Sequence, residues 1–280
     1  LEQALELSIL EKNAFDYSFI NKKVHSYFYQ LTPKKERIAA HLKLARTLEK
    51  QPDLENRFLP LFFHYSKTND FLKAYYWGMK LLHLLIDKYS YTHAIEVFEQ
   101  LLQFFYQIPN KQESDHLDFY AIVSKMAKIY IFKGNYNQII HILKDQLDYF
   151  ENSKNPEILS QIFLDLGRLF AIKGELKNSR SWYEKAVGIS EALDNPRMLK
   201  GIYENISMNY IFSGQFREAI NHFEKSLTSS PEAKIDEQSN MTLIGINAFA
   251  YASIGKYERA LQLLDELQTR IDRKSTRLNS

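Results

Sequence analysis

The sequence predicts an all-α protein, an α-solenoid in which pairs of helices follow one another along the chain. Three observations predict this class. Glycine and proline are scarce, with 9 and 7 among 280 residues, which favours helices over β-rich folds. Apolar residues recur at i, i+3, i+4 and i+7, which is one face of a helix. One motif also returns about every 40 residues, a period typical of solenoids.

Composition and charge narrow the class of protein. The 36 basic and 34 acidic residues give a net charge of +2, which is too balanced to indicate a nucleic-acid or membrane partner. The absence of cysteine excludes disulfides and thiolate metal sites. No apolar run reaches the ~18–20 residues of a membrane helix, and no secretory leader is visible. We therefore expect a cytoplasmic chain and, because it begins with Leu rather than Met, a fragment of a longer protein.

The first fifty residues differ from the rest of the chain. Residues 1–10 have the pattern of a helix, and the aromatic run 15-FDYSF-19 suggests a short strand or hairpin. A helix then follows, with Val24, Phe28 and Leu31 on one face. Thr32 and Pro33 are typical of the start of a second helix, which Thr32 would cap.

Residues 51–107 predict two degenerate helical repeats. The stretches 71-FLKAYYWGMKLL-82 and 91-YTHAIEVFEQLL-102 each have the pattern of a second helix, with Ala74 and Ala94 as the small residues. A loop near 108-IPNKQESD-115 joins them to the clearer repeats that follow.

Residues 116–271 contain four clear repeats of about 40 residues. Each has an aromatic residue four positions before a glycine and a large apolar residue two positions after it. The glycines are Gly134, Gly174, Gly214 and Gly255, and the aromatic residues are Tyr130, Phe170, Tyr210 and Tyr251. Since glycine adopts positive φ at low cost, each should end a first helix and turn the chain into a second.

Small residues mark where the paired helices pass closest. In the first helices they are Ala127, Gly167, Ser207 and Ala248, and in the second helices Ile139, Ser179, Ala219 and Ala260. Ile139 is the exception, and it predicts a wider spacing in its pair. Pro156, Pro196 and Pro231 stand between repeats, where a helix start tolerates proline.

These residues resemble the tetratricopeptide repeat over about residues 56–270. Its signature slots hold Leu166, Gly167, Phe170, Gly174, Ala219, Phe223 and Pro231. The resemblance implies a right-handed superhelix whose concave face, lined by the first helices, binds proteins. The period here exceeds the usual ~34 residues, so the helices or joins are longer.

The first fifty residues resemble the linker of bacterial signal-transduction ATPases of the STAND type, in which the end of a winged-helix module leads into helical repeats. The matching positions are Phe19, Lys23, Val24, Tyr29, Leu31, Pro33, Arg37 and His41, whereas Asn21 and Lys22 replace the usual His and Asp. The resemblance implies that residues 1–50 are a winged-helix remnant and a linker helix.

The last nine residues, 272-DRKSTRLNS-280, break the pattern of the preceding helix. They match the translation of a widely used sequencing adapter. We therefore interpret residues 272–280 as a non-native tail, with a natural basic tail as the alternative, and expect the natural protein to continue past Ile271.

No motif predicts catalysis. The sequence contains no G-x-x-x-x-G-K-[ST], H-E-x-x-H or G-x-S-x-G, so we expect no catalytic, cofactor or metal site. His41 and His64 lie on apolar faces and are interpreted as packing residues rather than ligands.

The candidate binding residues lie on the concave face that the resemblance implies. They are Lys128, Arg168, Glu204, Met208 and Phe249. Lys128 and Arg168 would hold an acidic peptide by charge-assisted hydrogen bonds, while Met208 and Phe249 would take an apolar anchor. The alternative is that the two cations only solvate the groove and the two apolar residues pack between repeats.

These observations favour a non-enzymatic protein-binding arm, a sensor or scaffold, of a larger cytoplasmic signalling ATPase. Its partners would be a protein or peptide in the groove and the upstream nucleotide-binding domain of the parent chain. The alternatives are a stand-alone adaptor, or the regulatory arm of a kinase, a nucleotide cyclase or a transcriptional regulator.

Overall fold

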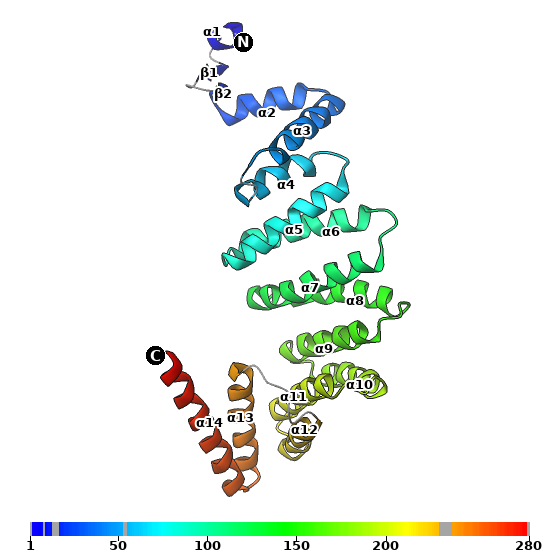
Figure 1. Cartoon of the computed structure of the whole chain (residues 1–280), viewed down its shortest axis with the longest axis vertical. Coiled ribbons are helices and arrows are strands. Elements are labelled where there is room, and N and C mark those ends of the chain that lie inside the picture. Colours follow the sequence, from blue (N-terminus) through cyan, green and yellow to red (C-terminus); the bar gives the residue numbers. More distant parts are fainter. Residues whose placement is uncertain (1, 8, 13–16, 53–54, 230–236, 279–280) are drawn as a thin grey trace. The chain divides into compact units, whose positions relative to one another are not determined.

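The computed structural model describes residues 2–7, 9–12, 17–52, 55–229 and 237–278, with the backbone alone at residues 17, 237–240, 270 and 273–278. The chain forms two compact units, Leu1–Gln112 and Glu113–Ser280, and the division falls in the predicted loop. Consecutive helices build both units (Figure 1), which confirms the predicted all-α class. Within the described ranges, no helix combines the length and apolar character that a membrane crossing requires.

The first unit opens with a short helix and a two-stranded ribbon. Helix α1 (Glu2–Glu6) precedes strand β1 (Leu10–Lys12), which pairs antiparallel with β2 (Tyr17–Phe19). This confirms the predicted hairpin for residues 17–19, while residues 15–16 lie outside the described residues. The helix predicted for residues 1–10 is wrong at Leu10, because its backbone pairs with Phe19 instead. A winged-helix origin for this segment stays a prediction.

Two helices follow the ribbon, α2 (Lys22–Leu31) and α3 (Lys34–Glu49). The prediction that Thr32 caps the second of them is wrong. Its hydroxyl donates to the carbonyl of Phe28 at 3.0 Å and so closes the end of α2. Pro33 occupies the N-cap position of α3, and its side chain offers no acceptor for the free N–H groups of the first turn.

The region predicted to hold two degenerate repeats contains three α-helices in its described part. They are α4 (Phe58–Ser66), α5 (Phe71–Asp87) and α6 (Tyr91–Gln107), preceded by the short 3-10 helix η1 (Glu55–Arg57). Helix α5 packs against both α4 and α6. Gly78 permits this, because a Cβ there would lie 2.6 Å from Leu101 of α6 and 2.7 Å from Phe62 of α4.

The second unit consists of four consecutive helix pairs. The first helices are α7 (Glu113–Lys133), α9 (Pro156–Ile172), α11 (Pro196–Phe212) and α13 (Glu237–Ser253), and the second helices are α8 (Tyr136–Phe150), α10 (Leu176–Ala192), α12 (Phe216–Ser229) and α14 (Tyr257–Leu278). Pro156 and Pro196 begin their helices as predicted, whereas Pro231 lies outside the described residues. Each first helix packs on its second helix, and α11 contacts both α9 and α13.

The glycine turns have the predicted geometry. Gly134, Gly174, Gly214 and Gly255 have φ values of 78°, 82°, 72° and 80°. After each glycine, the next backbone N–H returns to the carbonyl of the repeated aromatic residue, as from Glu175 to Phe170 at 2.9 Å. This bond satisfies a carbonyl that the helix end would leave free. The glycine and the aromatic residue therefore act together to end the first helix.

The small residues lie where helices cross closely. A Cβ on Gly167 would stand 2.3 Å from the ring of Tyr183, and Ala219 is fully buried. The wider spacing predicted from Ile139 agrees with the structure, since α7 and α8 share less contact than the pairs α9–α10 and α11–α12. Side-chain size at one position thus sets how closely each pair packs.

The last helix extends past the predicted boundary of the final repeat. Helix α14 runs to Leu278 instead of ending near Ile271. Residues 272–278 contain neither glycine nor proline, so nothing in their sequence stops helix propagation. The non-native origin of residues 272–280 stays a prediction.

Candidate functional site

The candidate site is the surface that α7, α9, α11 and α13 share, here called the first-helix face. The structure places every predicted binding residue on these four helices. Lys128 and Arg168 are exposed on α7 and α9, Glu204 and Met208 are half-buried on α11, and Phe249 is exposed on α13. The five residues therefore come from four successive repeats.

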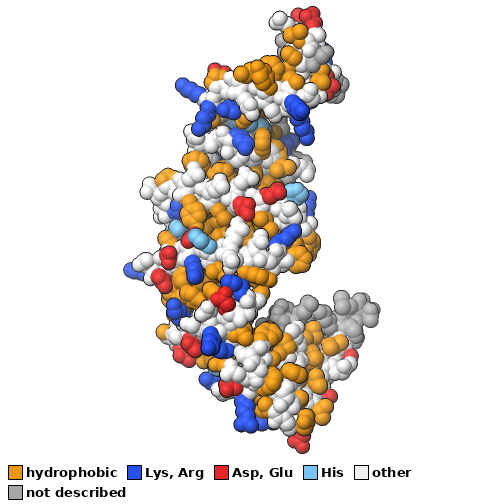
Figure 2. Space-filling view, turned by 180° about the vertical axis from the view of Figure 1, so that it is seen from behind, with side chains coloured by type: hydrophobic (Ala, Val, Ile, Leu, Met, Phe, Trp, Pro, Cys, Tyr) orange, Lys and Arg blue, Asp and Glu red, His pale blue; other side chains and the backbone are white. Residues whose placement is uncertain are grey.

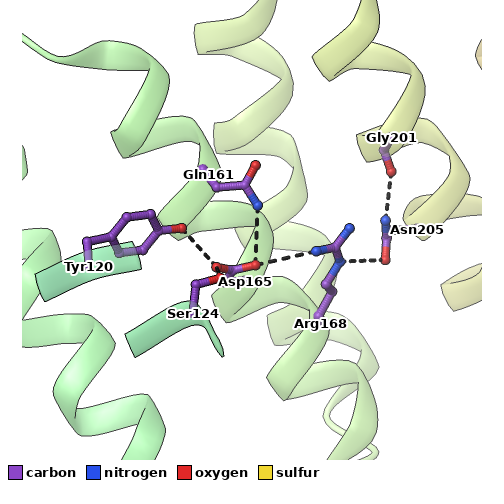
Figure 3. Close-up of polar contacts among 7 residues, drawn as sticks. All are labelled: Tyr120, Ser124, Gln161, Asp165, Arg168, Gly201 and Asn205. Atoms are coloured by element: carbon purple, nitrogen blue, oxygen red, sulfur yellow. Dashed lines mark hydrogen bonds and ion pairs between the residues drawn. The ribbon is translucent and has the colours of Figure 1, made fainter. Parts of the chain in front are cut away.

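Arg168 is held in place by two partners (Figure 3). Its Nη1 lies 3.4 Å from Oδ1 of Asp165, one turn earlier on α9, and its Nε donates to Oδ1 of Asn205 on α11 at 3.1 Å. Asn205 is itself fixed by donating to the carbonyl of Gly201 at 2.7 Å. The side chain of Arg168 remains 44% exposed, so an oriented guanidinium faces solvent.

Asp165 is the centre of this network, and the sequence analysis did not identify it. Its Oδ2 accepts hydrogen bonds from Tyr120 at 2.8 Å and from Ser124 at 3.0 Å, both on α7. Its Oδ1 accepts from Gln161 at 3.3 Å as well as from Arg168. Asp165 is only 7% exposed, and a buried carboxylate requires such donors.

Tyr120 is a stable hydrogen-bond donor to that carboxylate. Burial, and then the neighbouring charge of Asp165, raise the pKa of Tyr120 far above its ordinary value. The phenol therefore stays protonated and keeps donating. The result is a bridge from α7 through α9 to α11 that ends in the exposed cation of Arg168.

Glu204 lies near this cation but forms no ion pair with it. Burial raises the pKa of its carboxyl, against the opposing effect of the charges of Lys200 and Arg168. It sits one turn before Met208 on α11, so it places negative charge on the middle of the face.

The two apolar candidates differ in exposure. Met208 packs partly against the core cluster of the last two repeats. Part of its surface is therefore used in packing between repeats, which was the alternative to a binding role. Phe249 is 60% exposed, and its ring packs against that of Phe216 in a T-shaped arrangement, at 5.6 Å between centroids. Apolar side chains also gather on the surface over α13 and α14 (Figure 2).

In the first unit, the structure joins two histidines that the sequence analysis treated separately. His41 Nδ1 lies 2.8 Å from His64 Nδ1, and His41 Nε2 lies 3.0 Å from the hydroxyl of Tyr29. The pKa of His41 is lowered, first by burial and then by His64, Lys67 and Arg37, and burial lowers that of His64. Both are buried or half-buried as expected, but they form a neutral hydrogen-bonded chain across α2, α3 and α4.

The described residues contain no grouping of three or more His, Asp or Glu side chains that could hold a metal ion. The first-helix face combines the charged side chains of Lys128, Arg168 and Glu204 with the apolar side chains of Met208 and Phe249.

Comparison with known proteins supports the repeat assignment for the middle of the second unit. Residues 160–193 and 201–232 match the tetratricopeptide repeat family. A search of curated protein sequences gives no significant match.

Several solved structures have a similar fold. BtubC (BKLC) from P. vanneervenii has a TM-score of 0.61 at 14% identity, over 87% of this chain and 93% of that one. The apo form of RapI has a TM-score of 0.63 at 13% identity, over 72% of each chain. A Rap protein complexed with competence and sporulation factor has a TM-score of 0.57 at 14% identity, over 85% of this chain and 77% of that one. With the paired helices and the two matched repeats, these likenesses show a tetratricopeptide-like helical solenoid fold.

Proposed function

We propose that the first-helix face of residues 113–280 binds a protein or peptide partner and that Arg168 is its anchor. The orientation of Arg168 carries this proposal. Asp165 and Asn205 hold the guanidinium on two sides while the side chain stays 44% exposed. A cation that is ordered before binding loses less conformational entropy when a ligand carboxylate arrives.

The apolar end of the same face supports a polypeptide ligand. Phe249 is 60% exposed, and aromatic residues, like arginines, are enriched in binding hot spots. A Rap protein of similar fold has been solved with a bound factor, which supports the same use of this fold here.

Selection of peptides from a random displayed library against the intact chain tests this function. Selected peptides are then titrated by fluorescence anisotropy against wild type, Arg168→Met and Arg217→Met. Arg217 is exposed on the second helix α12, so it serves as the matched control. We expect Arg168→Met to weaken binding about tenfold, since a charged hydrogen bond contributes about 1.5–3 kcal/mol, and Arg217→Met to leave it unchanged.

Two results would contradict the proposal. One is that the selected peptides bind Arg168→Met as tightly as wild type. The other is that the library yields no peptide that binds the folded chain. Circular dichroism of each variant separates a lost contact from a lost fold.

At the level of the whole protein, we propose that this chain is the non-enzymatic sensor or scaffold arm of a cytoplasmic signalling ATPase of the STAND type. The order of ribbon, two helices and repeats in residues 10–107 supports it, together with the linker resemblance around Phe19 and His41. The coding sequence upstream of Leu1 tests it: a P-loop there is expected, and a start codon at that point would rule the proposal out.

A further inference from the structure

The first-helix face carries two parallel rows of side chains. The inner row consists of the residues six positions before each turn glycine, and the outer row of the residues two positions before it. The inner row is Lys128, Arg168, Met208 and Phe249, and the outer row is Phe132, Ile172, Phe212 and Ser253. Within each helix the two members are four residues apart, so they lie on the same helix face.

The outer row is apolar and exposed in three consecutive repeats. Phe132 is 78% exposed, Ile172 49% and Phe212 61%. A single exposed apolar residue is ordinary, but here the same slot is apolar and exposed on three successive first helices. Such a row on a folded chain is typical of a surface that a partner covers.

The inner row changes character along the repeats. It is basic on α7 and α9, where Lys128 and Arg168 stand, and apolar on α11 and α13, where Met208 and Phe249 stand. Lys128 takes part in none of the ion pairs found among the described residues. The charge of Lys128 is therefore not paired with any acidic side chain of the described residues.

Glu204 adds to the difference between the α7–α9 part and the α11–α13 part of the face. It lies on α11, one turn before Met208, and it would repel a ligand carboxylate placed over that helix. Asp165 offsets part of the charge of Arg168, but its carboxyl group is buried and does not reach a ligand on the surface. Ligand carboxylates are thus favoured over α7 and α9 and disfavoured over α11.

We propose that this face takes an extended polypeptide segment whose acidic residues are clustered at one end and whose large apolar residues are clustered at the other. The acidic end lies over α7 and α9, and the apolar end lies over α11 and α13. This inference rests on the proposed function and adds the chemical order of the ligand. Three steps between neighbouring helices of about 8–10 Å each span roughly 24–30 Å, which about nine extended residues cover at ~3.3 Å per residue.

Three fluorescein-labelled peptides of about twelve residues and identical composition test this order. Each contains equal numbers of Glu, Leu and Ser residues. One has the Glu block first, one has the Leu block first, and one alternates Glu with Leu. Because the segment can run in either direction along the face, we expect at least one block peptide to bind the intact chain about tenfold tighter than the alternating peptide.

Charge-reversal variants of the protein test where the acidic end of the peptide binds. We expect Lys128→Glu to weaken the preferred block peptide about tenfold, and Lys177→Glu, an exposed site on the second helix α10, to change it less than twofold. The Phe212→Ser variant should weaken both block peptides without altering the salt dependence of binding, because it removes apolar contact and leaves the charges in place.

Equal binding of all three peptides would overturn the inference, and so would binding that Lys128→Glu leaves unchanged. If library-selected peptides bind through Arg168 but no block peptide is preferred, the ligand order is wrong and the proposed function stands. If neither set binds through this face, both proposals fail.

Discussion

The two units let their helices pack closely in the same way, but they differ in the polar groups that they bury. Each uses a glycine where helices cross closely, Gly78 in the first unit and Gly167 in the second. Between successive helices, however, the first unit buries the neutral chain around His41 and His64. The second buries the carboxyl group of Asp165 among hydrogen-bond donors.

This difference shows what each arrangement can do. The histidine chain has Arg37 and Lys67 nearby, and these cations oppose its protonation. It is therefore suited to holding helices together in a neutral state. The carboxylate of Asp165 instead attracts a cation, and that cation reaches the surface as Arg168. In the second unit, a buried carboxylate thus orients a cation that is partly exposed at the surface.

The largest effect is expected from Gly167→Ala. The added Cβ would stand 2.3 Å from the ring of Tyr183, which is itself 1% exposed and has little room to move. We expect a loss of about 3 kcal/mol in the free energy of unfolding, the upper range for overpacking. Urea unfolding measures it. Gly188→Ala is the matched control, because nothing lies within 4 Å of that site, and it should stabilise the helix by about 0.5–1 kcal/mol.

Asp165→Asn is expected to cost about 2 kcal/mol, because an amide N–H₂ would face donors that now point at a carboxylate. Its control is Asp265→Asn, an exposed site on α14, which should change stability by less than about 0.5 kcal/mol. Urea unfolding followed by circular dichroism compares them. Equal stabilities for the two variants would mean that Asp165 does not organise the bridge between α7 and α9.

Lowering the pH is expected to reduce the stability of the first unit by a smaller amount. The pKa values of His41 and His64 lie below 6.5 in the folded state, so the unfolded chain binds protons first. The stability that the pair contributes is complete above pH 6.5 and is lost as the pH falls from 6.5 through the folded-state values. Two imidazolium rings would also bring two Nδ1–H donors face to face. We expect a loss of about 1 kcal/mol.

The two tryptophans allow this loss to be assigned to one unit, since Trp77 lies in the first and Trp182 in the second. In chain labelled with 5-fluorotryptophan, ¹⁹F spectra follow each unit separately during urea unfolding at pH 7.5 and pH 5. The double variant His41→Gln, His64→Gln should flatten the pH dependence of the Trp77 signal, and His141→Gln, an exposed site, should not. An unchanged pH dependence in the double variant would show that the pair is not the acid-sensitive element.

The smallest effect is expected from Lys73→Met. Lys73 Nζ lies 2.8 Å from Oε1 of Glu49, and its side chain is 45% exposed. Exposed ion pairs contribute about 0.2–1 kcal/mol, and the indole N–H of Trp77 still donates to the same oxygen at 2.9 Å. We expect a loss of no more than about 0.5 kcal/mol by urea unfolding. A loss as large as that of Asp165→Asn would mean that the first unit also depends on a charged contact.

Local sequence signals predicted most of the second unit. The glycine at the turn and the aromatic residue four positions before it were visible as a pattern, because both act within one helix end. The small residues, such as Gly167 and Ala219, were visible because they recur at one slot of each repeat, although they act between two helices. By contrast, Thr32 was placed in the wrong helix because its hydroxyl can serve either end of a short break between helices.

The candidate site was predicted only in part. Arg168 and Phe249 followed from their slots in the repeat, but Asp165 was missed. Its spacing of three residues from Arg168 was a usable signal for an ion pair on one helix. Its burial was not visible, because that depends on Tyr120 and Ser124, which lie more than forty residues earlier in the chain.

The sequence by itself determined the class of fold, the positions of the turns and the slots of Lys128, Arg168, Met208 and Phe249 on the first helices, since all of these depend on neighbours within a few residues. Only the tertiary structure decided that His41 meets His64 and that Asp165 holds Arg168 toward solvent. The first contact joins two helices, and Asp165 is itself held by Tyr120 and Ser124 of another helix. Both arrangements therefore depend on how closely the helices pack rather than on a local pattern alone.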